Sequence, residues 1–435
     1  MEEVVVVGSG VSGLSTAYRL KKQGVNVVVY EKEDDIGGNI KTLKVDSYTI
    51  ELGPQTVLAD EEVLGFFRDL GLRPVEASPS SKRRYILKKG KLIPVPLNPV
   101  SFLTSPLLSL RGKIRVFKEI FLSPVSGEES LADFVRRRLG EEVLTYLVQP
   151  FVSGVYAGDP EALSVRYAFP RLYALEKEFG SLIKGAVKKR SFGPKGKLVS
   201  FEGGLRTLTE RLAGEVEVRR ENVVLRIRRK EDRFILDTRG GKVEAKAVVV
   251  SSPAYTASYL LKDLSWSASS EFDSIDYPPV AVVNVGVKAG SVPDGFGFLV
   301  PRVENRKILG AIFTSRIFKG RAPEDRDLLT VYLGGSTDRS VADMSEEEIA
   351  EAVEKDLTEI LGVPGVEVIK VKVWKKAIPQ YTVGYGKYIN LAREMEETFP
   401  GLFLTGNYLS GISVPDCIRY SEKVADKVVR YLEGC

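Results

Sequence analysis

The chain has 435 residues, which is long for one hydrophobic core, so two or three domains are expected. With 43% hydrophobic and 28% charged residues, its composition is globular and excludes disorder, collagen and coiled coil. The formal net charge of +5, from 63 basic and 58 acidic residues, is too small to indicate nucleic-acid binding. There is no histidine, which excludes Ser-His-Asp triads, histidine metal ligands and imidazole acid–base catalysis.

Targeting and membrane signals are weak in this sequence. Residues 1–7 enter a strand directly and lack the basic segment of a signal peptide. No apolar run approaches the 18 residues or so that a membrane-spanning helix needs. The two cysteines, Cys417 and Cys435, are too few for a disulfide framework or a cysteine-based zinc site. We therefore expect a cytoplasmic protein without a metal, and peripheral contact with the inner face of the cell membrane stays open.

The first thirty residues predict a strand, a glycine-rich turn, a helix and a second strand. Residues 4–7 are β-branched, and Gly8-x-Gly10-x-x-Gly13 follows them. Apolar residues then recur at helical spacing and lead to a second buried strand at 25–30. This βαβ unit is typical of the start of a parallel sheet.

In this context the glycines form a dinucleotide-binding fingerprint. The first allows a tight turn, the second lets the backbone approach a pyrophosphate, and the third allows the helix to pack closely on the strand. The helix N-terminus offers free N–H groups and a positive dipole to the anion. Glu31, after the second strand, is placed to accept hydrogen bonds from ribose hydroxyls. Its charge would repel a 2′-phosphate and therefore argues against NADP.

Later glycine-rich turns favour FAD over NAD. The doublet Gly37-Gly38 lies just beyond Glu31, where bare backbone can approach the pyrophosphate of an extended FAD. Gly53-Pro54 and residues 404–414 supply two further backbone turns. The helix after the last of these turns can face the N1–C2=O edge of a flavin ring. Taken singly, each turn also has an ordinary structural interpretation.

The remaining elements are predicted from caps, turns and periodicity. Residues 95–190 are first interrupted by prolines and then helical, with a helix from Ser130 to Gly140. Strands follow within 216–255 and 278–335. The last elements are a helix capped at Ser345 that ends near Gly362, a strand at 402–405 and a helix from Pro415. Because nucleotide-binding signals lie at both chain ends, we expect interleaved domains.

Seven sequence blocks resemble one enzyme family over the full length of the chain. They are residues 50–54 (Ile-Glu-Leu-Gly-Pro), 137–143, 153–159 (Ser-Gly-Val-Tyr-Ala-Gly-Asp), 202–205, 295–301, 378–381 (Ile-Pro-Gln-Tyr) and 415–418. The chain resembles the flavin-containing amine oxidase superfamily and, within it, the oxygen-dependent protoporphyrinogen oxidases of haem synthesis. The blocks at 154–159 and 378–381 are the most specific to porphyrinogen oxidases.

The resemblance implies an α/β fold with three interleaved parts. These are an FAD-binding Rossmann-like domain of the glutathione-reductase type (1–75, 195–258 and 378–435), a mixed-sheet substrate-binding domain (76–94 and 259–377), and a helical domain that is a candidate for membrane association (95–194).

The resemblance also implies non-covalent FAD and a set of contacts to it. These contacts are Gly8, Gly10, Gly13, Glu31, Lys32, Gly38, Asn39, Gly53, Pro54, Gln55, Thr56, Val224, Trp374, Asn407, Ile412, Ser413 and Val414. The sequence departs from many superfamily members around the glycine doublet, because Asp35 and Asn39 flank it where those members carry arginines.

The substrate contacts that the resemblance implies fall into three kinds. Arg84 matches an arginine that meets a substrate propionate, which suits the bidentate geometry of a guanidinium. Apolar or aromatic walls are implied at Phe296, Leu299, Ile312 and Tyr332, and Gly154 would lie beside the pyrrole rings. Without the resemblance, Arg84 would be assigned to a solvated hairpin and the wall residues to ordinary core.

The implied reaction is the oxidation of a porphyrinogen by three O₂ to a porphyrin and three H₂O₂. A hydride leaves a methylene bridge for flavin N5, and the acidic pyrrole N–H that results can lose its proton to water, so no catalytic side chain is required. The nearest alternative is oxidation of coproporphyrinogen III to coproporphyrin III. A more distant one is a flavin-free binding protein of the GDP-dissociation-inhibitor type.

Residues 100–122 predict an amphipathic segment. Ile114, Phe117 and Phe121 fall on one helical face, and Arg115, Lys118 and Glu119 fall on the other. One interpretation is a helix packed on its own domain. The other is a shallow anchor, whose apolar residues enter one leaflet while basic residues meet anionic headgroups. A homodimer and contact with the next enzyme of haem synthesis are further candidate partnerships.

Overall fold

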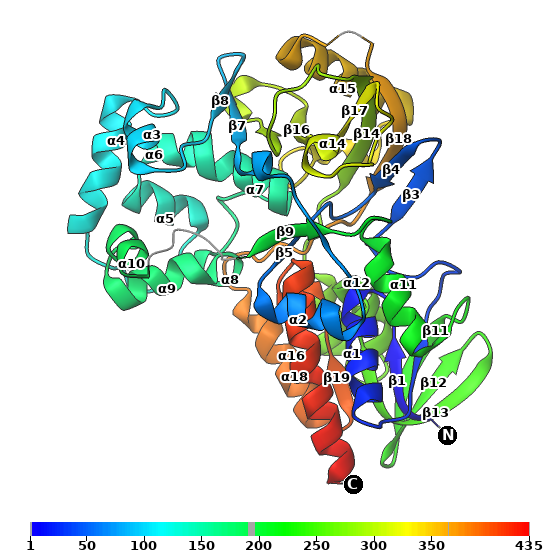
Figure 1. Cartoon of the computed structure of the whole chain (residues 1–435). Helices are drawn as coiled ribbons and strands as arrows, with labels where there is room; N and C mark the ends of the chain where they lie inside the picture. Colours follow the sequence, from blue (N-terminus) through cyan, green and yellow to red (C-terminus); the bar gives the residue numbers. More distant parts are fainter. Residues whose placement is uncertain (1, 190–195, 364, 435) are drawn as a thin grey trace.

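The computed structural model describes residues 2–189, 196–363 and 365–434. Its elements form three regions (Figure 1). A dinucleotide region built on one seven-stranded sheet contains both chain ends, a second seven-stranded sheet forms the substrate region, and a group of helices lies to the side of that second sheet. The predicted boundary at 194–195 lies outside the described residues, and the domain limits stay predictions.

The first sheet contains the predicted strand–helix–strand unit. Its strands are β1 Glu2–Val7, β2 Val27–Tyr30, β10 Glu217–Arg219, β11 Val224–Lys230, β12 Arg233–Thr238, β13 Gly241–Val250 and β19 Leu402–Leu404. The order is β10-β2-β1-β13-β12-β11, and β19 pairs with the second half of β13. β1 lies parallel to both β2 and β13. Val4, Val5 and Val6 are fully buried because both faces of this sheet are covered.

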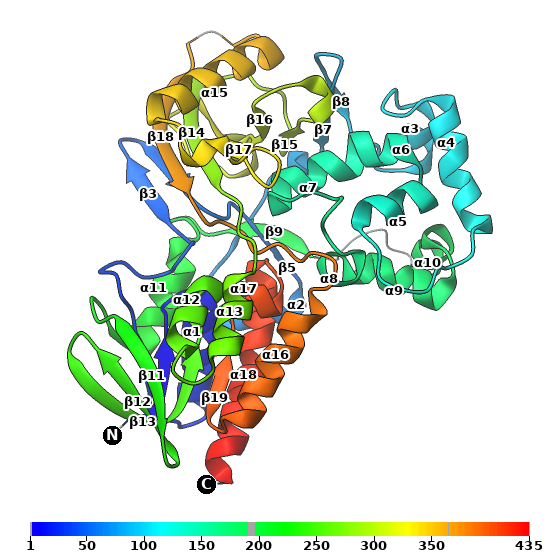
Figure 2. The same ribbon diagram turned by 180° about the vertical axis from the view of Figure 1, so that it is seen from behind.

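Helices cover the two faces of the first sheet. The face of Val4 and Val6 packs against α1 Val11–Lys22, α2 Glu61–Asp69, α11 Arg206–Glu215 and α18 Val414–Glu433. The face of Val5 and Val7 packs against α12 Ala254–Leu261, α13 Trp266–Asp273 and α16 Gly386–Thr398, which Figure 2 shows from behind. The closing helix begins at Val414, one residue before the predicted start, with Ser413 as its N-cap.

The second sheet is mixed, as expected. In the order in which they pair, its strands are β18 Glu367–Trp374, β14 Val280–Lys288, β17 Arg326–Gly334, β16 Ile308–Ile312, β15 Gly297–Leu299, β7 Arg84–Lys88 and β8 Lys91–Pro94. Only β15 and β7 pair in parallel. One face packs on α15 Glu346–Leu361, whose predicted capping box at Ser345 and αL glycine at Gly362 are both present.

Short elements connect the longer ones within and between the two sheets. They are the hairpin of β3 Thr42–Val45 and β4 Tyr48–Glu51, the sheet of β5 Val57–Ala59, β9 Lys197–Ser200 and β6 Val75–Glu76, the helices α14 Thr314–Ile317 and α17 Asn407–Ser410, and the 3-10 turns at Pro79–Lys82, Arg302–Glu304 and Arg339–Ala342.

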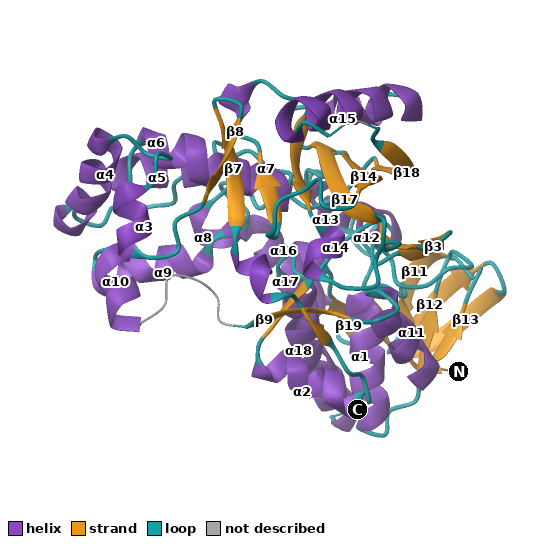
Figure 3. Cartoon of the chain, turned by 45° about the horizontal axis from the view of Figure 1, so that its top comes forward, coloured by secondary structure: helices purple, strands orange, loops and turns teal. Residues whose placement is uncertain are grey.

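The helical region lies beside the second sheet (Figure 3). Its elements are α3 Pro99–Thr104, α4 Leu110–Phe117, a 3-10 turn Lys118–Phe121, α5 Leu131–Arg138, α6 Glu141–Val143, a π-turn Leu144–Val148, α7 Gln149–Tyr156, α8 Val165–Ala168, α9 Pro170–Phe179 and α10 Leu182–Lys189. The predicted N-cap at Ser130 is present. Among the helices of the described residues, none is both long and apolar enough to cross a membrane.

One side chain of the amphipathic segment was assigned to the wrong face. Glu119 was placed with the polar outer residues, but it is fully buried. The segment changes from α-helix to a 3-10 turn at Lys118, which alters the helical phase. The Glu119 carboxylate then accepts from Arg138 Nη1 at 3.1 Å, from Ser181 Oγ at 2.6 Å and from the Leu182 N–H at 2.8 Å.

Candidate active site

The glycine fingerprint forms an open backbone cradle between β1 and α1. Gly8 has φ +106°, a left-handed conformation that favours glycine. A side chain on Gly13 would overlap the Gly8 carbonyl and Ser251 Oγ, whereas a Cβ on Gly10 would meet no atom within 4 Å. Gly37 bridges to Gly10, so the doublet lies directly on the fingerprint. No side chain caps the N-terminus of α1, and its first N–H groups are therefore available to an anion.

Glu31 is held at the carboxyl end of β2, beside this cradle. One carboxylate oxygen accepts from the Ser9 N–H at 2.8 Å and from Ser9 Oγ at 2.6 Å, and the other accepts from the Glu33 N–H at 3.0 Å. The Glu31 carbonyl accepts from the Asn222 N–H at 2.8 Å, which brings the segment before Val224 to the same edge. Lys32 is exposed and pairs with Glu33.

The turn at 53–56 is fixed from two sides. Gly53 lies against the Asn39 carbonyl so closely that a side chain there would overlap it. Trp374 Nε1 donates to the Leu52 carbonyl at 2.6 Å. The structure thus brings together Gly53, Asn39 and Trp374, three predicted cofactor contacts from separate parts of the chain.

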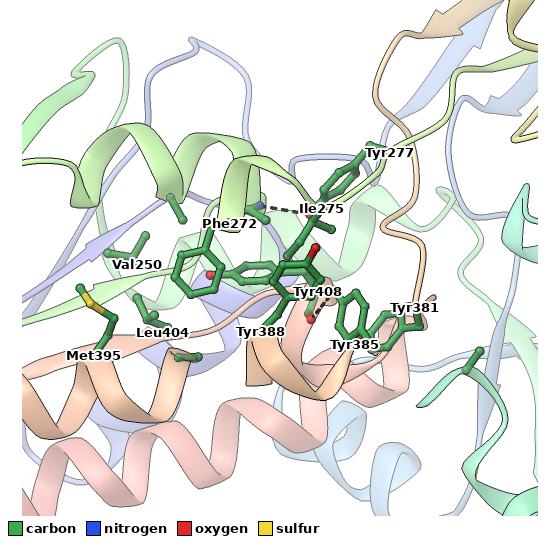
Figure 4. Close-up of a cluster of buried hydrophobic side chains, with 14 of the residues drawn as sticks. Val250, Phe272, Ile275, Tyr277, Tyr381, Tyr385, Tyr388, Met395, Leu404 and Tyr408 are labelled. Atoms are coloured by element: carbon green, nitrogen blue, oxygen red, sulfur yellow. Dashed lines mark hydrogen bonds between the residues drawn. The ribbon is translucent and has the colours of Figure 1, made fainter. Parts of the chain in front are cut away.

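The C-terminal turn rests on a buried aromatic cluster, which Figure 4 shows. Tyr381 donates its hydroxyl proton to the Asn407 carbonyl at 2.6 Å, and the Gly411 N–H donates to the same hydroxyl at 3.0 Å. The rings of Tyr381 and Tyr385 stack with centroids 4.2 Å apart. Because Tyr381 belongs to the predicted Ile-Pro-Gln-Tyr block, that block supports the turn at Asn407 and Ile412.

Three unpartnered hydroxyls provide an independent test of fit for a dinucleotide. Ser15 of α1, Ser252 after β13 and Thr405 after β19 have buried hydroxyl oxygens with no hydrogen-bond partner among the described residues. Buried polar groups are normally bonded. These three residues lie on the elements whose ends form the cradle. The cradle therefore combines unpaired hydroxyl groups, glycine backbone without side chains, and helix N–H groups that have no capping side chain. The residues therefore fit an extended dinucleotide such as FAD.

Four of the six predicted substrate residues, Arg84, Leu299, Ile312 and Tyr332, lie on one face of the second sheet. Residues that pair across strands share a face, and Gly297 pairs with Arg84 and with Ile312, while Gly310 pairs with Leu299 and with Tyr332. The Arg84 guanidinium carbon is 4.9 Å from the centroid of the Phe296 ring. A Cβ on Gly154 of α7 would overlap Leu299 Cδ2. All six predicted substrate contacts are thus gathered in one place.

Arg84 lacks an ionic partner among the described residues. Its guanidinium instead makes a cation–π contact with the face of the Phe296 ring, and the side chain is exposed. Although water reaches the side chain, the surrounding protein removes part of its hydration and thereby lowers the pKa of the guanidinium. An unpaired cation at the edge of an apolar face is suited to a carboxylate ligand.

Sequence reasoning missed the polar network beneath the 53–56 turn. Asn284 Nδ2 donates to the Glu51 carbonyl at 3.2 Å, and Thr330 Oγ1 lies 3.0 Å from Asn284 Oδ1 and 3.2 Å from Gln55 Oε1. Asn284 and Thr330 lie inside valine- and leucine-rich strands. The one signal in the sequence was a polar residue with apolar residues on both sides of it. Arg321, which approaches Glu51, lies in no recognisable motif.

Comparison with known proteins agrees with this site. The family model "Flavin containing amine oxidoreductase" matches residues 11–429. The chain belongs to this family. FAD is therefore its cofactor, and the enzyme is an oxidoreductase.

The relatives of this flavin-containing oxidoreductase carry porphyrinogen oxidase names. Chloroplastic protoporphyrinogen oxidase 1 of Spinacia oleracea is 37% identical, covering 99% of this chain and 84% of its own. Coproporphyrinogen III oxidase of Bacillus subtilis (strain 168) is 30% identical, covering 99% and 98%. A solved structure from Exiguobacterium sp. 255-15, described as a protoporphyrinogen oxidase, has TM-score 0.85 and 26% identity, covering 99% of each chain.

Proposed function

We propose that the protein is an FAD-dependent oxidase that converts protoporphyrinogen IX to protoporphyrin IX with O₂. The observation that carries this proposal is the apolar face formed by Phe296, Leu299 and Ile312, with the unpaired guanidinium of Arg84 at its edge. A flat apolar macrocycle with propionate side chains matches both features. The relatives named protoporphyrinogen oxidase, 33–37% identical over the whole chain, support the same substrate class.

The side chains at this site serve to bind and orient the substrate. FAD, when bound, supplies the electron acceptor for removal of a hydride from a methylene bridge. Arg84 would hold a propionate, and the apolar face would fix the ring plane. Burial raises the pKa of Tyr332 well above its usual value, so its hydroxyl stays neutral and is not a base. The proton released from a pyrrole N–H can pass to water without a basic side chain.

The charge of the substrate face favours a dicarboxylate over a tetracarboxylate. Among the residues of β7, β15, β16 and β17 that share this face, three are basic, Arg84, Lys88 and Arg326, and Arg326 already pairs with Glu367. Lys88 Nζ already donates to the Pro106 and Leu107 carbonyls at 3.0 and 2.7 Å. One free guanidinium suits protoporphyrinogen, with two carboxylates, better than coproporphyrinogen III, with four.

The decisive experiment compares the two porphyrinogens on the purified holoenzyme, with porphyrin fluorescence as the readout. Protoporphyrinogen IX should give the higher kcat/KM. A preference for coproporphyrinogen III would assign the protein to the other reaction. A visible flavin spectrum excludes the flavin-free binding-protein alternative, and acid precipitation should release all of the yellow colour because the FAD is expected to be non-covalent.

We further propose that the α3–α4 face is a peripheral membrane surface, with residues 97–121 as its extent. Val100, Leu103, Ile114, Phe117 and Phe121 are 48–81% exposed. Arg115, expected to meet headgroups, instead donates to the carbonyls that end α5, among them Arg138 at 3.1 Å. Lys118 and Arg111 are exposed and supply the cationic contacts in its place.

A further inference from the structure

Glu51 is a buried carboxylate at the junction of the two sheets, and the proposed reaction does not use it. It ends β4, two residues before Gly53, and its side chain is 2% exposed. Removing a carboxylate from water is unfavourable unless hydrogen bonds and an opposite charge compensate for the lost hydration. The partners of Glu51 therefore indicate what this residue holds in place.

Three separate segments hold the Glu51 carboxylate. Thr42 of β3 donates its hydroxyl proton to Oε2 at 2.6 Å. The Leu205 N–H, at the start of α11, donates to Oε1 at 2.8 Å. Arg321 Nη1 lies 3.4 Å from Oε1. Gly204, with φ +89°, makes room for this arrangement, since a side chain there would overlap Thr42.

Arg321 links this carboxylate to the substrate region. It lies between α14 and β17, and its side chain is 3% exposed. Its Nη2 donates to Ser200 Oγ at 2.7 Å and to the Phe201 carbonyl at 3.1 Å. Its own carbonyl accepts from the Thr49 N–H at 3.0 Å. These side-chain hydrogen bonds thus go to elements next to the dinucleotide region, while the guanidinium carbon lies 5.7 Å from the centroid of the Phe318 ring in the substrate region.

The backbone of Glu51 is held from the opposite side. Its carbonyl accepts from Gln55 Nε2 and from Asn284 Nδ2, each at 3.2 Å. Gln55 belongs to the predicted flavin-facing turn, and Asn284 lies on β14 of the second sheet. Residue 51 therefore connects that turn directly to the sheet that carries the candidate substrate face.

We propose that Glu51 and Arg321 are positioning residues: together they fix the 53–56 turn against the second sheet and so set how the bound flavin meets its substrate. The pair acts through the turn and touches neither the substrate face nor, in the expected geometry, the flavin.

The proton on Glu51 provides a way to observe this role. Burial raises the pKa of Glu51 to about 7, although Thr42, the Leu205 N–H and Arg321 act to lower it. Burial also lowers the pKa of Arg321. Tyr332 is a further titratable group that interacts with Glu51, and it stays neutral because burial raises its pKa. The carboxyl therefore changes charge close to neutral pH, directly beside the flavin-facing turn.

The test follows the visible absorption of the bound flavin across neutral pH in the holoenzyme. The wild-type spectrum should show a step centred near pH 7. E51Q, which keeps the shape and most hydrogen bonds but cannot ionise, should bind FAD and lose the step. R321M should move the step to higher pH, because the Arg321 charge lowers the pKa of Glu51. R321M should also weaken FAD binding by about tenfold or more, because one partner of a buried pair is lost.

The matched control is R316M. It breaks the pair between Arg316 and Asp327, whose Nη2 and Oδ2 lie 2.8 Å apart, within the substrate region and away from the turn. It should keep the wild-type step. A wild-type spectrum without a step near neutral pH, or an E51Q protein that keeps one, would overturn the proposal. If R321M does not fold, the E51Q titration alone decides. These measurements use no porphyrinogen. A negative result would therefore contradict the positioning role of Glu51 and Arg321 without bearing on the proposed substrate.

Discussion

The two seven-stranded sheets use their residues in opposite ways. In the first sheet, helices cover both faces, and the ends of the strands, with their glycine turns, form the candidate site for the cofactor. In the second sheet, α15 covers one face, and side chains on the other face form the candidate substrate wall. Backbone therefore forms most of the candidate cofactor site, whereas side chains such as those of Arg84 and Tyr332 form the candidate substrate site.

This difference decides which substitutions each site tolerates. A backbone cradle is damaged when an atom is added, because glycine is there for its space or its φ angle. A side-chain wall is damaged when an atom is removed, because charge or apolar surface is lost. Substitutions of both kinds test this difference between the two sites.

Gly13→Ala should have the largest effect. The new methyl group would overlap the Gly8 carbonyl and Ser251, which are not free to move. We expect the apoprotein to lose about 1–3 kcal/mol of unfolding free energy and to bind no FAD. Unfolding of the apoprotein in denaturant and FAD titration measure the two effects.

Gly10→Ala is the matched control within the same turn. A Cβ there meets no protein atom within 4 Å, so the stability of the apoprotein should be unchanged while FAD affinity falls. Equal destabilisation by both variants would show that the fingerprint is a structural turn and not a cofactor cradle.

The contrast also explains what could be predicted from the sequence. Gly8, Gly10 and Gly13 are predictable because a backbone site requires a residue type at fixed local spacing. Arg84 and Leu299 come close together because strands from distant segments of the chain pair with each other. Local spacing does not reveal such pairings, so only the family resemblance predicted that the two residues share a site. Glu119 was assigned to the wrong face because a 3-10 turn, which periodicity does not reveal, follows α4. Arg321 could not be predicted, because its partners lie far from it in sequence.

Arg84→Ala tests the side-chain site. Loss of a charge-assisted hydrogen bond of about 1.5–3 kcal/mol should raise KM for protoporphyrinogen roughly tenfold or more. FAD content should stay normal, because no predicted cofactor contact touches Arg84. Steady-state kinetics and the ratio of flavin to protein absorbance measure both. Arg83→Ala removes an exposed neighbouring charge and serves as the control. An unchanged KM in Arg84→Ala would contradict the propionate contact and support the alternative interpretation, in which Arg84 is a solvated hairpin residue.

Gly154→Ala tests the opposite edge of the substrate face. The methyl group would displace Leu299 Cδ2, the end of a flexible side chain, so the fold should tolerate it. We expect a loss of about 1 kcal/mol, roughly fivefold in kcat/KM, without loss of FAD. Gly65→Ala in α2 is the control, since its Cβ would come no closer than 3.7 Å to a neighbouring atom. If Gly154→Ala keeps the wild-type kinetics, the prediction that Gly154 lies beside the substrate is wrong.

The last prediction concerns the helical region, which borders the side-chain site. Phe117 and Phe121 are 51% and 81% exposed. Exposed aromatic rings beside free cations suit the boundary between headgroups and acyl chains. Replacing both with serine should weaken co-sedimentation with anionic liposomes by about 1 kcal/mol, roughly fivefold, because shallow insertion removes only part of each ring from water. The holoenzyme should keep its FAD. Trp266→Ser removes an equally exposed ring, 67% accessible, from the dinucleotide region, and should leave liposome binding unchanged. Wild-type protein that stays in the supernatant at low salt would show that this exposed face does not bind lipid.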